Sequence, residues 1–338
     1  MDPALYRDLK TSRGFNYHYY FSKAQGKRAT LLFCHGFPST SWDWRYLANY
    51  FQKQGYGIVV PDLLGYGGTS KPTDPTAYQH SLISKDLIDI LDAEGIAQAI
   101  PVGHDWGSVV VSRLCNYFPE RFIAYAFIAV PHNPPWPTLT METLLAGTKA
   151  QFGYELYGYW LFFSEDGAAK ILEDNWDSFI SLMYPYEHTI WENNVCPTGA
   201  IKSALLSGFK KPLPSYLTEA DKKRITDTLL GGGLAGPLCW YKVMTSGIQA
   251  KDDERAPLAQ YFPPKSSPIF FGAAAKDGIA LAALGKYVFT SEPYKEHNVT
   301  IRDFDGDHWI IFSHADEINR ELGLWLENVV APLRKAQL

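Results

Sequence analysis

Short apolar runs that lack the polar alternation of a half-exposed strand recur along the sequence, with helix-like stretches between them. Strands that are apolar on both faces are typical of a parallel sheet covered by helices on each side. The expected strands are 17–21, 29–34, 57–61, 99–102, 124–130, 268–272 and 298–304. The expected helices are 81–94, 108–117, 280–287 and 315–330. This alternation predicts an α/β fold with a mostly parallel central sheet flanked by helices.

The pattern changes at Pro131. Four prolines within residues 131–137 mark a turn-rich passage, and a helix-dominated, aromatic-rich region follows to about Lys251. The α/β pattern resumes at Ser267. We therefore expect a core domain formed by residues 1–131 and 252–338, with residues 132–251 inserted between them as a helical cap domain.

Length and charge narrow the class of protein. A chain of 338 residues is long enough for one large core with an inserted subdomain. The formal net charge is −5 without any block of like charge, which argues against nucleic-acid and membrane partners. We find no signal-peptide pattern, and no apolar run reaches the roughly 18 residues that span a bilayer. The terminal Ala336-Gln337-Leu338 differs from a Ser-Lys-Leu peroxisomal signal, so we expect a cytoplasmic protein.

The cysteines and aromatic residues add two expectations. The four cysteines are far apart and form no Cys-x-x-Cys pair, which favours reduced, buried thiols over a disulfide framework or a metal site. Aromatic residues make up 15% of the chain, and many lie between Trp136 and Trp191. These aromatic residues form either ordinary core or the wall of a pocket for an apolar ligand.

The motif Gly-His-Asp-Trp-Gly at 103–107 lies where an expected strand meets an expected helix. Flanking glycines permit a sharp strand-to-helix turn that pushes the central side chain out at the top of the sheet. Here that side chain is Asp105, and a carboxylate nucleophile forms an ester with an alkyl carbon. The alternative is a Gly-rich turn in which Asp105 only caps the next helix.

Three further segments favour the catalytic interpretation. The motif His-Gly-Phe-Pro at 35–38 follows a strand and can direct the Phe37 N–H toward the same point as the Trp106 N–H, forming an oxyanion hole. His308 follows the last expected strand, in the chain order of nucleophile, acid and histidine. Asp277 follows the preceding strand and can orient the His308 ring. The nearby carboxylates Asp303, Asp305 and Asp307 compete for that role.

Taken together, these segments resemble the soluble epoxide hydrolases. The resemblance rests on residues 35–38, on Ser-Trp-Asp-Trp-Arg at 41–45, on the Gly-rich run 62–70 and on Gly-His-Asp-Trp-Gly-Ser at 103–108. It covers nearly the whole chain and is weaker across the insertion. It implies an α/β-hydrolase fold with a helical lid, an Asp105 ester intermediate, and conversion of an epoxide to a vicinal diol without any cofactor.

The resemblance also implies two lid tyrosines that hydrogen-bond the epoxide oxygen and protonate it. The run 159–167 is similar to the family's first lid segment, apart from Ser164 in place of Gln, and assigns Tyr159. The run 238–242 is similar to the second segment and assigns Tyr241. Tyr154 and Tyr157 remain substitutes for Tyr159. The residues expected to contact substrate are His35, Pro38, Trp160, Trp240 and Trp309.

In the implied mechanism, Asp105 attacks an epoxide carbon while the two phenols donate to the oxygen. His308, oriented by Asp277, then activates the water that hydrolyses the ester. The partners are thus a small apolar epoxide and water, and the protein would act as a monomer or homodimer. Three alternatives remain open: a haloalkane or haloacid dehalogenase with indole N–H donors, a serine esterase, and a non-catalytic receptor on the same fold.

Overall fold

A computed structural model describes residues 1–333 and contains an eight-stranded sheet in the order β1-β2-β4-β3-β5-β6-β7-β8. The strands are β1 (Tyr6–Lys10), β2 (Asn16–Ser22), β3 (Thr30–Cys34), β4 (Gly57–Pro61), β5 (Ile100–His104), β6 (Tyr125–Ile128), β7 (Ile269–Ala274) and β8 (Val299–Phe304). The strands from β4 to β8 pair in parallel, while β1 and β2 are antiparallel. The mostly parallel sheet expected from the sequence is therefore confirmed. The terminal Ala336–Leu338 lies outside the described residues.

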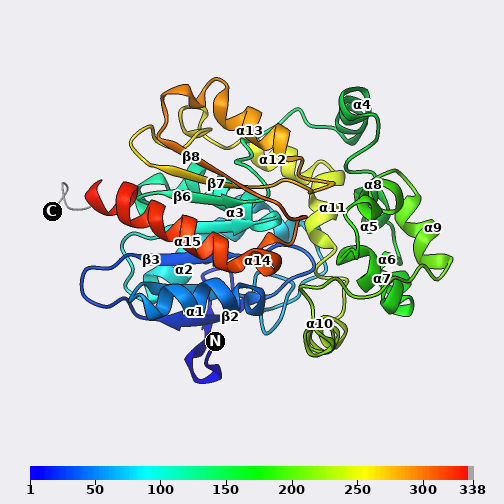
Figure 1. The fold of residues 1–338 in the computed structure, drawn as a ribbon, viewed down its shortest axis with the longest axis horizontal. Helices are drawn as coiled ribbons and strands as arrows, with labels where there is room; N and C mark the ends of the chain where they lie inside the picture. Colours follow the sequence, from blue (N-terminus) through cyan, green and yellow to red (C-terminus); the bar gives the residue numbers. More distant parts are fainter. Residues whose placement is uncertain (334–338) are drawn as a thin grey trace.

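Helices cover both faces of this sheet. The helices α1 (Arg45–Lys53) and α15 (Ala315–Trp325) pack together, as do α2 (His80–Ala93) and α3 (Trp106–Tyr117). Figure 1 shows α1 and α15 in front of the sheet, with α3 behind it. The connection between β7 and β8 contains α13 (Ala282–Thr290), and α14 (Ile310–Ser313) precedes α15. Strand β1 and helix α1 had not been predicted.

Several element boundaries differ from those expected. The strand expected over 124–130 ends at Ile128, because Ala129 adopts a positive φ of 62° that stops extended pairing. The helix expected from residue 108 begins at Trp106, directly after the turn. The helix expected over 315–330 ends at Trp325 and continues as a π-helical turn, Leu326–Val330.

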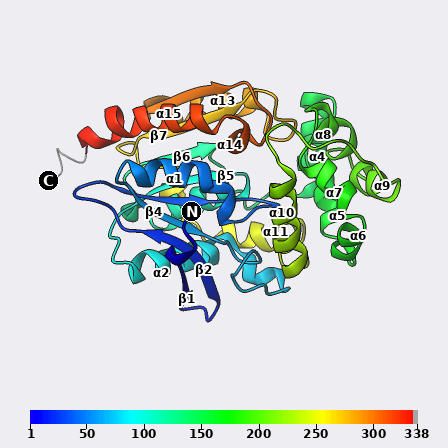
Figure 2. The same cartoon turned by 60° about the horizontal axis from the view of Figure 1, so that its bottom comes forward.

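All named elements between β6 and β7 are helical. They are α4 (Met141–Phe152), α5 (Tyr159–Phe163), α6 (Ala168–Asp174), α7 (Trp176–Met183), α8 (Thr189–Asn194), α9 (Ala200–Leu206), α10 (Glu219–Gly232), α11 (Cys239–Thr245), α12 (Ile248–Asp253) and the short η5 (Leu258–Gln260). Figures 1 and 2 show α5 to α9 gathered at one end of the sheet, with α11 between them and the strands. The exact cap boundaries, 132 and 251, stay a prediction.

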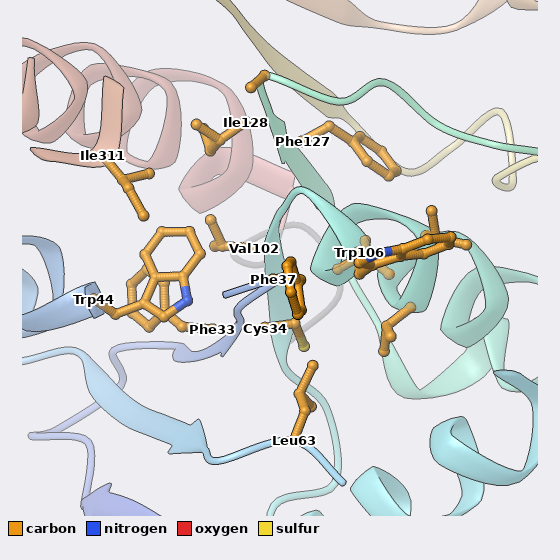
Figure 3. Packing of buried hydrophobic residues seen from close by; sticks show 14 of the residues in the cluster. Phe33, Cys34, Phe37, Trp44, Leu63, Val102, Trp106, Phe127, Ile128 and Ile311 are labelled. Atoms are coloured by element: carbon orange, nitrogen blue, oxygen red, sulfur yellow. The ribbon is translucent and has the colours of Figure 1, made fainter. Parts of the chain in front are cut away.

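The core follows from the sheet. Strands β3, β4, β5, β6 and β7 are buried along their whole length, as their continuous apolar runs suggested. Figure 3 shows Phe37 and Trp106 among core side chains that include Cys34 and Val102. All four cysteines are free and buried. Across residues 1–333, no helix has the length and apolar character needed to cross a bilayer.

Candidate active site

The turn between β5 and α3 holds Asp105 in an unusual backbone conformation. Asp105 has φ 53° and ψ −128°, and a non-glycine residue adopts a positive φ only where its surroundings enforce it. A Cβ on Gly103 would lie 2.5 Å from the Gly107 carbonyl oxygen, and a Cβ on Gly107 would lie 1.9 Å from the Cys34 oxygen. Both flanking positions therefore require glycine, and the turn projects the Asp105 side chain beyond the sheet.

Parallel pairing places the loop after β3 beside this turn. Cys34 pairs with Gly103, so the residues that follow each strand emerge at the same edge of the sheet. A Cβ on Gly36 would lie 2.1 Å from Asp105 Oδ1, which shows how closely the loop approaches the carboxylate. The Phe37 N–H donates to Asp105 Oδ1 at 2.8 Å, and the Trp106 backbone N–H lowers the pKa of the same carboxylate. Both expected oxyanion donors thus converge on Asp105.

The same pairing logic brings His308 and Asp277 together. Strands β7 and β8 pair from Ile269 with Val299 to Ala274 with Phe304, so the loops after them are adjacent. His308 Nδ1 lies 2.7 Å from Asp277 Oδ2, and His308 Nε2 lies 3.5 Å from Asp105 Oδ2. The other Asp277 oxygen accepts the backbone N–H groups of residues 279 and 280 at 2.8 and 2.9 Å.

The three competing carboxylates face other partners. Asp303 accepts a hydrogen bond from Lys286, and Asp305 accepts one from Lys276. Asp307 accepts from the Tyr216 hydroxyl and from the Trp309 N–H. Of the four candidates, Asp277 is therefore the one placed against the His308 ring.

The buried charges set one another's ionisation. Burial raises the pKa of Asp105 and of Asp277, but His308 and the neighbouring hydrogen-bond donors together outweigh burial and hold both pKa values below their ordinary 3.8. Burial lowers the pKa of His308, yet the charge of Asp277, together with hydrogen bonds and charge from Asp105, raises it to about 10. In the resting site, a positive imidazolium therefore lies between two carboxylates.

The cap brings Tyr159, from α5, and Tyr241, from α11, above this centre. Their ring centroids are 5.8 Å apart, and the Tyr241 ring packs edge-on against Trp106 at 5.3 Å and against Phe37 at 5.1 Å. Burial raises the pKa of both phenols well above 10, and the Asp105 charge raises it further. Both phenols therefore stay protonated, so each can act as a hydrogen-bond donor.

Of the alternative tyrosines, Tyr154 has its hydroxyl engaged, whereas Tyr157 lies near the charges of Asp277 and Asp105. The Tyr154 hydroxyl donates to the Gly278 carbonyl at 3.0 Å, so its proton is already engaged. The Tyr157 ring packs on Trp160 at 5.0 Å. Trp160 itself, expected to contact substrate, packs on Trp106 at 5.0 Å and keeps its buried indole N–H without a partner among the described residues.

The other four expected substrate contacts have their polar groups paired within the protein. His35 Nε2 accepts the Leu63 N–H, and its Nδ1 contacts the Gly36 carbonyl, both at 2.9 Å. The Trp240 indole donates to the carbonyl of residue 64, and the Trp309 indole donates to that of residue 183. The Pro38 carbonyl accepts a hydrogen bond from the hydroxyl of residue 184. All four residues are buried, and we propose supporting roles for them in place of substrate contact.

Two residues beside His308 were missed from the sequence. The Trp191 ring of the cap lies 5.0 Å from the His308 ring, with its indole N–H donated to the Leu182 carbonyl. His104 Nε2 lies 2.8 Å from the His308 carbonyl, and burial lowers the pKa of His104 to about 3. A neutral His104 can donate its proton to that carbonyl. No sequence pattern pointed to Trp191, whereas His104 belonged to the recognised motif.

The arrangement has the parts of a covalent hydrolytic centre. A carboxylate accepts the Phe37 backbone N–H, a histidine–aspartate pair lies beside it, and two protonated phenols lie above it. Such a centre can displace a poor leaving group at an alkyl carbon and then hydrolyse the ester. Among residues 1–333, no group of three or more His, Cys, Asp or Glu is arranged to hold a metal ion.

Comparison with known proteins identifies the same fold, and the similar proteins carry the names of epoxide hydrolases. A family model described as the alpha/beta hydrolase fold matches residues 29–158. Bifunctional epoxide hydrolase 2 of Sus scrofa is 28% identical over 308 residues, which are 89% of this chain and 52% of that protein. Epoxide hydrolase 3 of Siraitia grosvenorii is 31% identical over 222 residues, 64% of this chain and 66% of that protein.

Among solved structures, an epoxide hydrolase from an endophytic Streptomyces has a TM-score of 0.78 and 26% identity, and the match covers 96% of this chain and 95% of that one. The chain spans about half the length of the mammalian relatives that it matches. The α/β-hydrolase fold with a helical insertion is thus confirmed. The chain has the α/β-hydrolase fold, and the relatives that it is similar to are named as epoxide hydrolases.

Proposed function

We propose that this protein is an epoxide hydrolase that converts an epoxide to a vicinal diol through an ester on Asp105. The observation that carries the proposal is the position of the Asp105 carboxylate. The carboxylate is bound by the Phe37 N–H at one oxygen and faces His308 with the other oxygen. The two buried phenols of the cap are the donors that an epoxide oxygen needs, and the charge of Asp105 raises the pKa of both. The names of the relatives support the same reaction.

In the first half-reaction, Asp105 Oδ2 attacks one epoxide carbon and breaks its bond to the ring oxygen. The oxygen leaves as an alkoxide unless a donor protonates it, and Tyr159 and Tyr241 supply that proton. A positioned general acid of this kind contributes roughly 10² to 10⁴ in rate. The product is a hydroxyalkyl ester on Asp105 and one phenolate in the cap.

The ester changes the charge state of His308. In the resting site, the charges of Asp277 and Asp105 together keep the ring protonated, since they raise its pKa to about 10. Esterification removes the charge of Asp105, which is one of the causes that raise the pKa of His308, so this pKa falls. The imidazolium can then return its proton to the phenolate through water. The cycle thus restores the phenol and leaves a neutral His308, which is the form that a general base requires.

In the second half-reaction, neutral His308 takes a proton from water as the hydroxide attacks the ester carbonyl. Negative charge returns to Asp105 Oδ1, where the Phe37 and Trp106 N–H groups stabilise it. Collapse of this intermediate releases the diol and leaves an ionised Asp105 beside a protonated His308. The protons balance without any other reactant.

The walls around the site favour an apolar substrate. Tyr241 packs against Phe163 at 4.8 Å and against Phe37 at 5.1 Å, and the Phe37 ring also contacts Phe179 at 6.0 Å. The charged group in direct contact with Asp105 is His308, which takes part in the reaction itself. We propose a small apolar epoxide as the substrate, with water as the second reactant.

The direct test is capture of the ester. His308→Gln should alkylate Asp105 with styrene oxide at close to the wild-type rate but fail to hydrolyse the ester. Mass spectrometry of the intact variant should then show one added substrate mass, located on the peptide that contains Asp105. Asp105→Asn is the matched control and should show no adduct. Absence of an adduct in His308→Gln would count against the covalent mechanism, and it would leave the receptor interpretation standing.

A bromoalkane distinguishes the dehalogenase alternative. The unpaired indole N–H of Trp160 is the kind of donor that a leaving halide needs. If the protein opens epoxides, styrene oxide should give the diol faster than a bromoalkane of similar size gives bromide. Bromide release without diol formation would replace the proposal by dehalogenation.

A further inference from the structure

The residue that ends α7 touches both loops of the hydrolytic apparatus. Tyr184 follows Met183 at the C-terminus of α7 and is fully buried. It belongs to the cap, yet its contacts are with two loops of the sheet domain. Neither the sequence motifs nor the proposed reaction gives it a role.

The first contact reaches the loop that carries the oxyanion donor. The Tyr184 hydroxyl donates to the Pro38 carbonyl at 2.6 Å, in a buried environment. Pro38 directly follows Phe37, whose N–H donates to Asp105 Oδ1 at 2.8 Å. A hydrogen bond to the Pro38 carbonyl therefore restrains the loop two peptide units beyond the oxyanion donor.

The second contact reaches the loop that carries the histidine. The Tyr184 ring stacks on Trp309, with centroids 4.6 Å apart and an interplanar angle of 29°. The Trp309 indole N–H donates to the Met183 carbonyl at 2.7 Å. Trp309 directly follows His308 and is also fully buried. Two consecutive cap residues, Met183 and Tyr184, therefore bind the neighbours of both Phe37 and His308.

The two half-reactions place opposite demands on these loops. During ester formation, Asp105 loses negative charge, so an N–H donor at Oδ1 gives no extra stabilisation to the transition state. During ester hydrolysis, charge returns to that oxygen and His308 must align a water, so both loops act at once. A device that positions both loops should therefore affect hydrolysis and spare alkylation.

We propose that Tyr184 is a positioning residue for the hydrolytic half-reaction, because it holds the Phe37 loop and the His308 loop in register from the cap. This inference rests on the proposed function. Tyr184 touches no reacting atom and acts through the Pro38 carbonyl and the Trp309 ring. The cap would thus contribute to both halves of the reaction: its phenols to ring opening, and Tyr184 to ester hydrolysis.

The test compares Tyr184→Phe with Tyr78→Phe. Tyr78 is a matched control, because it is also fully buried and its hydroxyl donates to another proline carbonyl, that of Pro72, at 2.7 Å. Rapid quench with styrene oxide gives the alkylation rate, and mass spectrometry gives the fraction of protein held as ester at steady state. Thermal unfolding of both variants measures the purely structural cost.

Tyr184→Phe should hydrolyse the ester about tenfold more slowly and alkylate at the wild-type rate, so the ester fraction rises and KM falls with kcat. Tyr78→Phe should leave both rates unchanged. The proposal is overturned if Tyr184→Phe matches Tyr78→Phe, or if it slows both half-reactions equally. If Tyr184→Phe does not fold, Trp309→Phe removes the bond to Met183 and must give the same separation of rates. Absence of any ester in the wild type would instead refute the proposed function.

Discussion

The sheet domain and the cap position their functional groups by different means. In the sheet domain, backbone geometry fixes the site. Asp105 has a positive φ, and a Cβ at Gly36, Gly103 or Gly107 would lie within 2.5 Å of a neighbouring atom. Parallel pairing of β3 with β5 and of β7 with β8 then brings the loops together. Few alternative sequences satisfy these constraints, which is why they leave a readable motif.

In the cap, packing between side chains positions the functional groups. Tyr159 begins the five-residue helix α5, directly after Gly158, where a Cβ would lie 2.3 Å from the Thr198 backbone nitrogen. Its ring packs edge-on against Phe163 at 5.4 Å and lies 5.8 Å from Tyr241, so aromatic contacts set its direction. Many aromatic sequences could pack in this way. The site thus combines a rigid, motif-defined base with a lid whose geometry depends on packing.

The largest effect on rate should come from the charge that orients His308 in the sheet domain. Asp277→Asn removes this charge and favours the wrong imidazole tautomer, so ester hydrolysis should fall by about 10⁴ while ester formation persists. Single-turnover kinetics with mass detection of the ester measure both steps. Asp307→Asn is the control, because Asp307 bonds Tyr216 and Trp309 instead of the ring. Equal losses in the two variants would show that Asp277 is not the orienting acid.

A steric change at the base of the site should have the next largest effect. Gly36→Ala would place a methyl group 2.1 Å from Asp105 Oδ1, so the carboxylate must move away from both Phe37 and an incoming epoxide. We expect ester formation to fall by about 10³, since misplacement by 1 Å alone can cost about 10². Gly147→Ala, on the exposed surface of α4 with no atom within 4 Å, should be silent. An active Gly36→Ala would mean that the loop can move to accommodate the methyl group.

The lid tyrosines should give a smaller and separable effect. Tyr159→Phe and Tyr241→Phe each remove one donor and leave the other, so each should slow ester formation by about 10² without changing ester hydrolysis. Tyr154→Phe is the control, because its hydroxyl bonds Gly278. Pre-steady-state alkylation rates decide the assignment. Loss in Tyr154→Phe with full activity in Tyr159→Phe would move the role to Tyr154.

The pH dependence should differ between the half-reactions by several-fold. Alkylation needs an ionised Asp105, whose pKa is held below 3.8, so its rate should change little between pH 6 and pH 9. Hydrolysis needs neutral His308 in the ester, so its rate should fall as the pH is lowered and ester should accumulate. The ester fraction at steady state measures this effect. A fraction that does not change with pH would contradict the role of His308 as base.

The resting charge of His308 also predicts a change in stability. The pKa of His308 is raised from 6.5 to about 10, so the charged ring stabilises the fold fully below pH 6.5. That contribution is lost as the pH rises through 10. The advantage of the wild type over His308→Gln in urea unfolding should therefore shrink between pH 6 and pH 10. A constant difference would mean that the ring is neutral at rest.

The contrast between the two regions also explains what the sequence could predict. The positions of Asp105, His308 and Phe37 followed from glycine spacing and chain order, because backbone constraints are local. Asp277 could be chosen over Asp303, Asp305 and Asp307 because a residue adjacent to a histidine generally cannot reach its ring, and the pairing of β7 with β8 places Asp277 beside His308.

The contacts of Trp191 and Tyr184 could not be predicted, because they join segments more than 100 residues apart through packing alone. The edge strand β1 was missed because it lacks the continuous apolar run that marked the buried strands. Helix α1 buries Leu47, Ala48 and Phe51 on one face, so helical spacing could have predicted it.

The central claim is that Asp105 forms a covalent ester, and oxygen labelling tests it most directly. A single turnover in water enriched in oxygen-18, with enzyme in excess over styrene oxide, should give unlabelled diol. The label should instead appear in the peptide that contains Asp105, since water attacks the ester carbonyl. Labelled diol with an unlabelled Asp105 would show direct attack of water on the epoxide and would contradict the covalent mechanism.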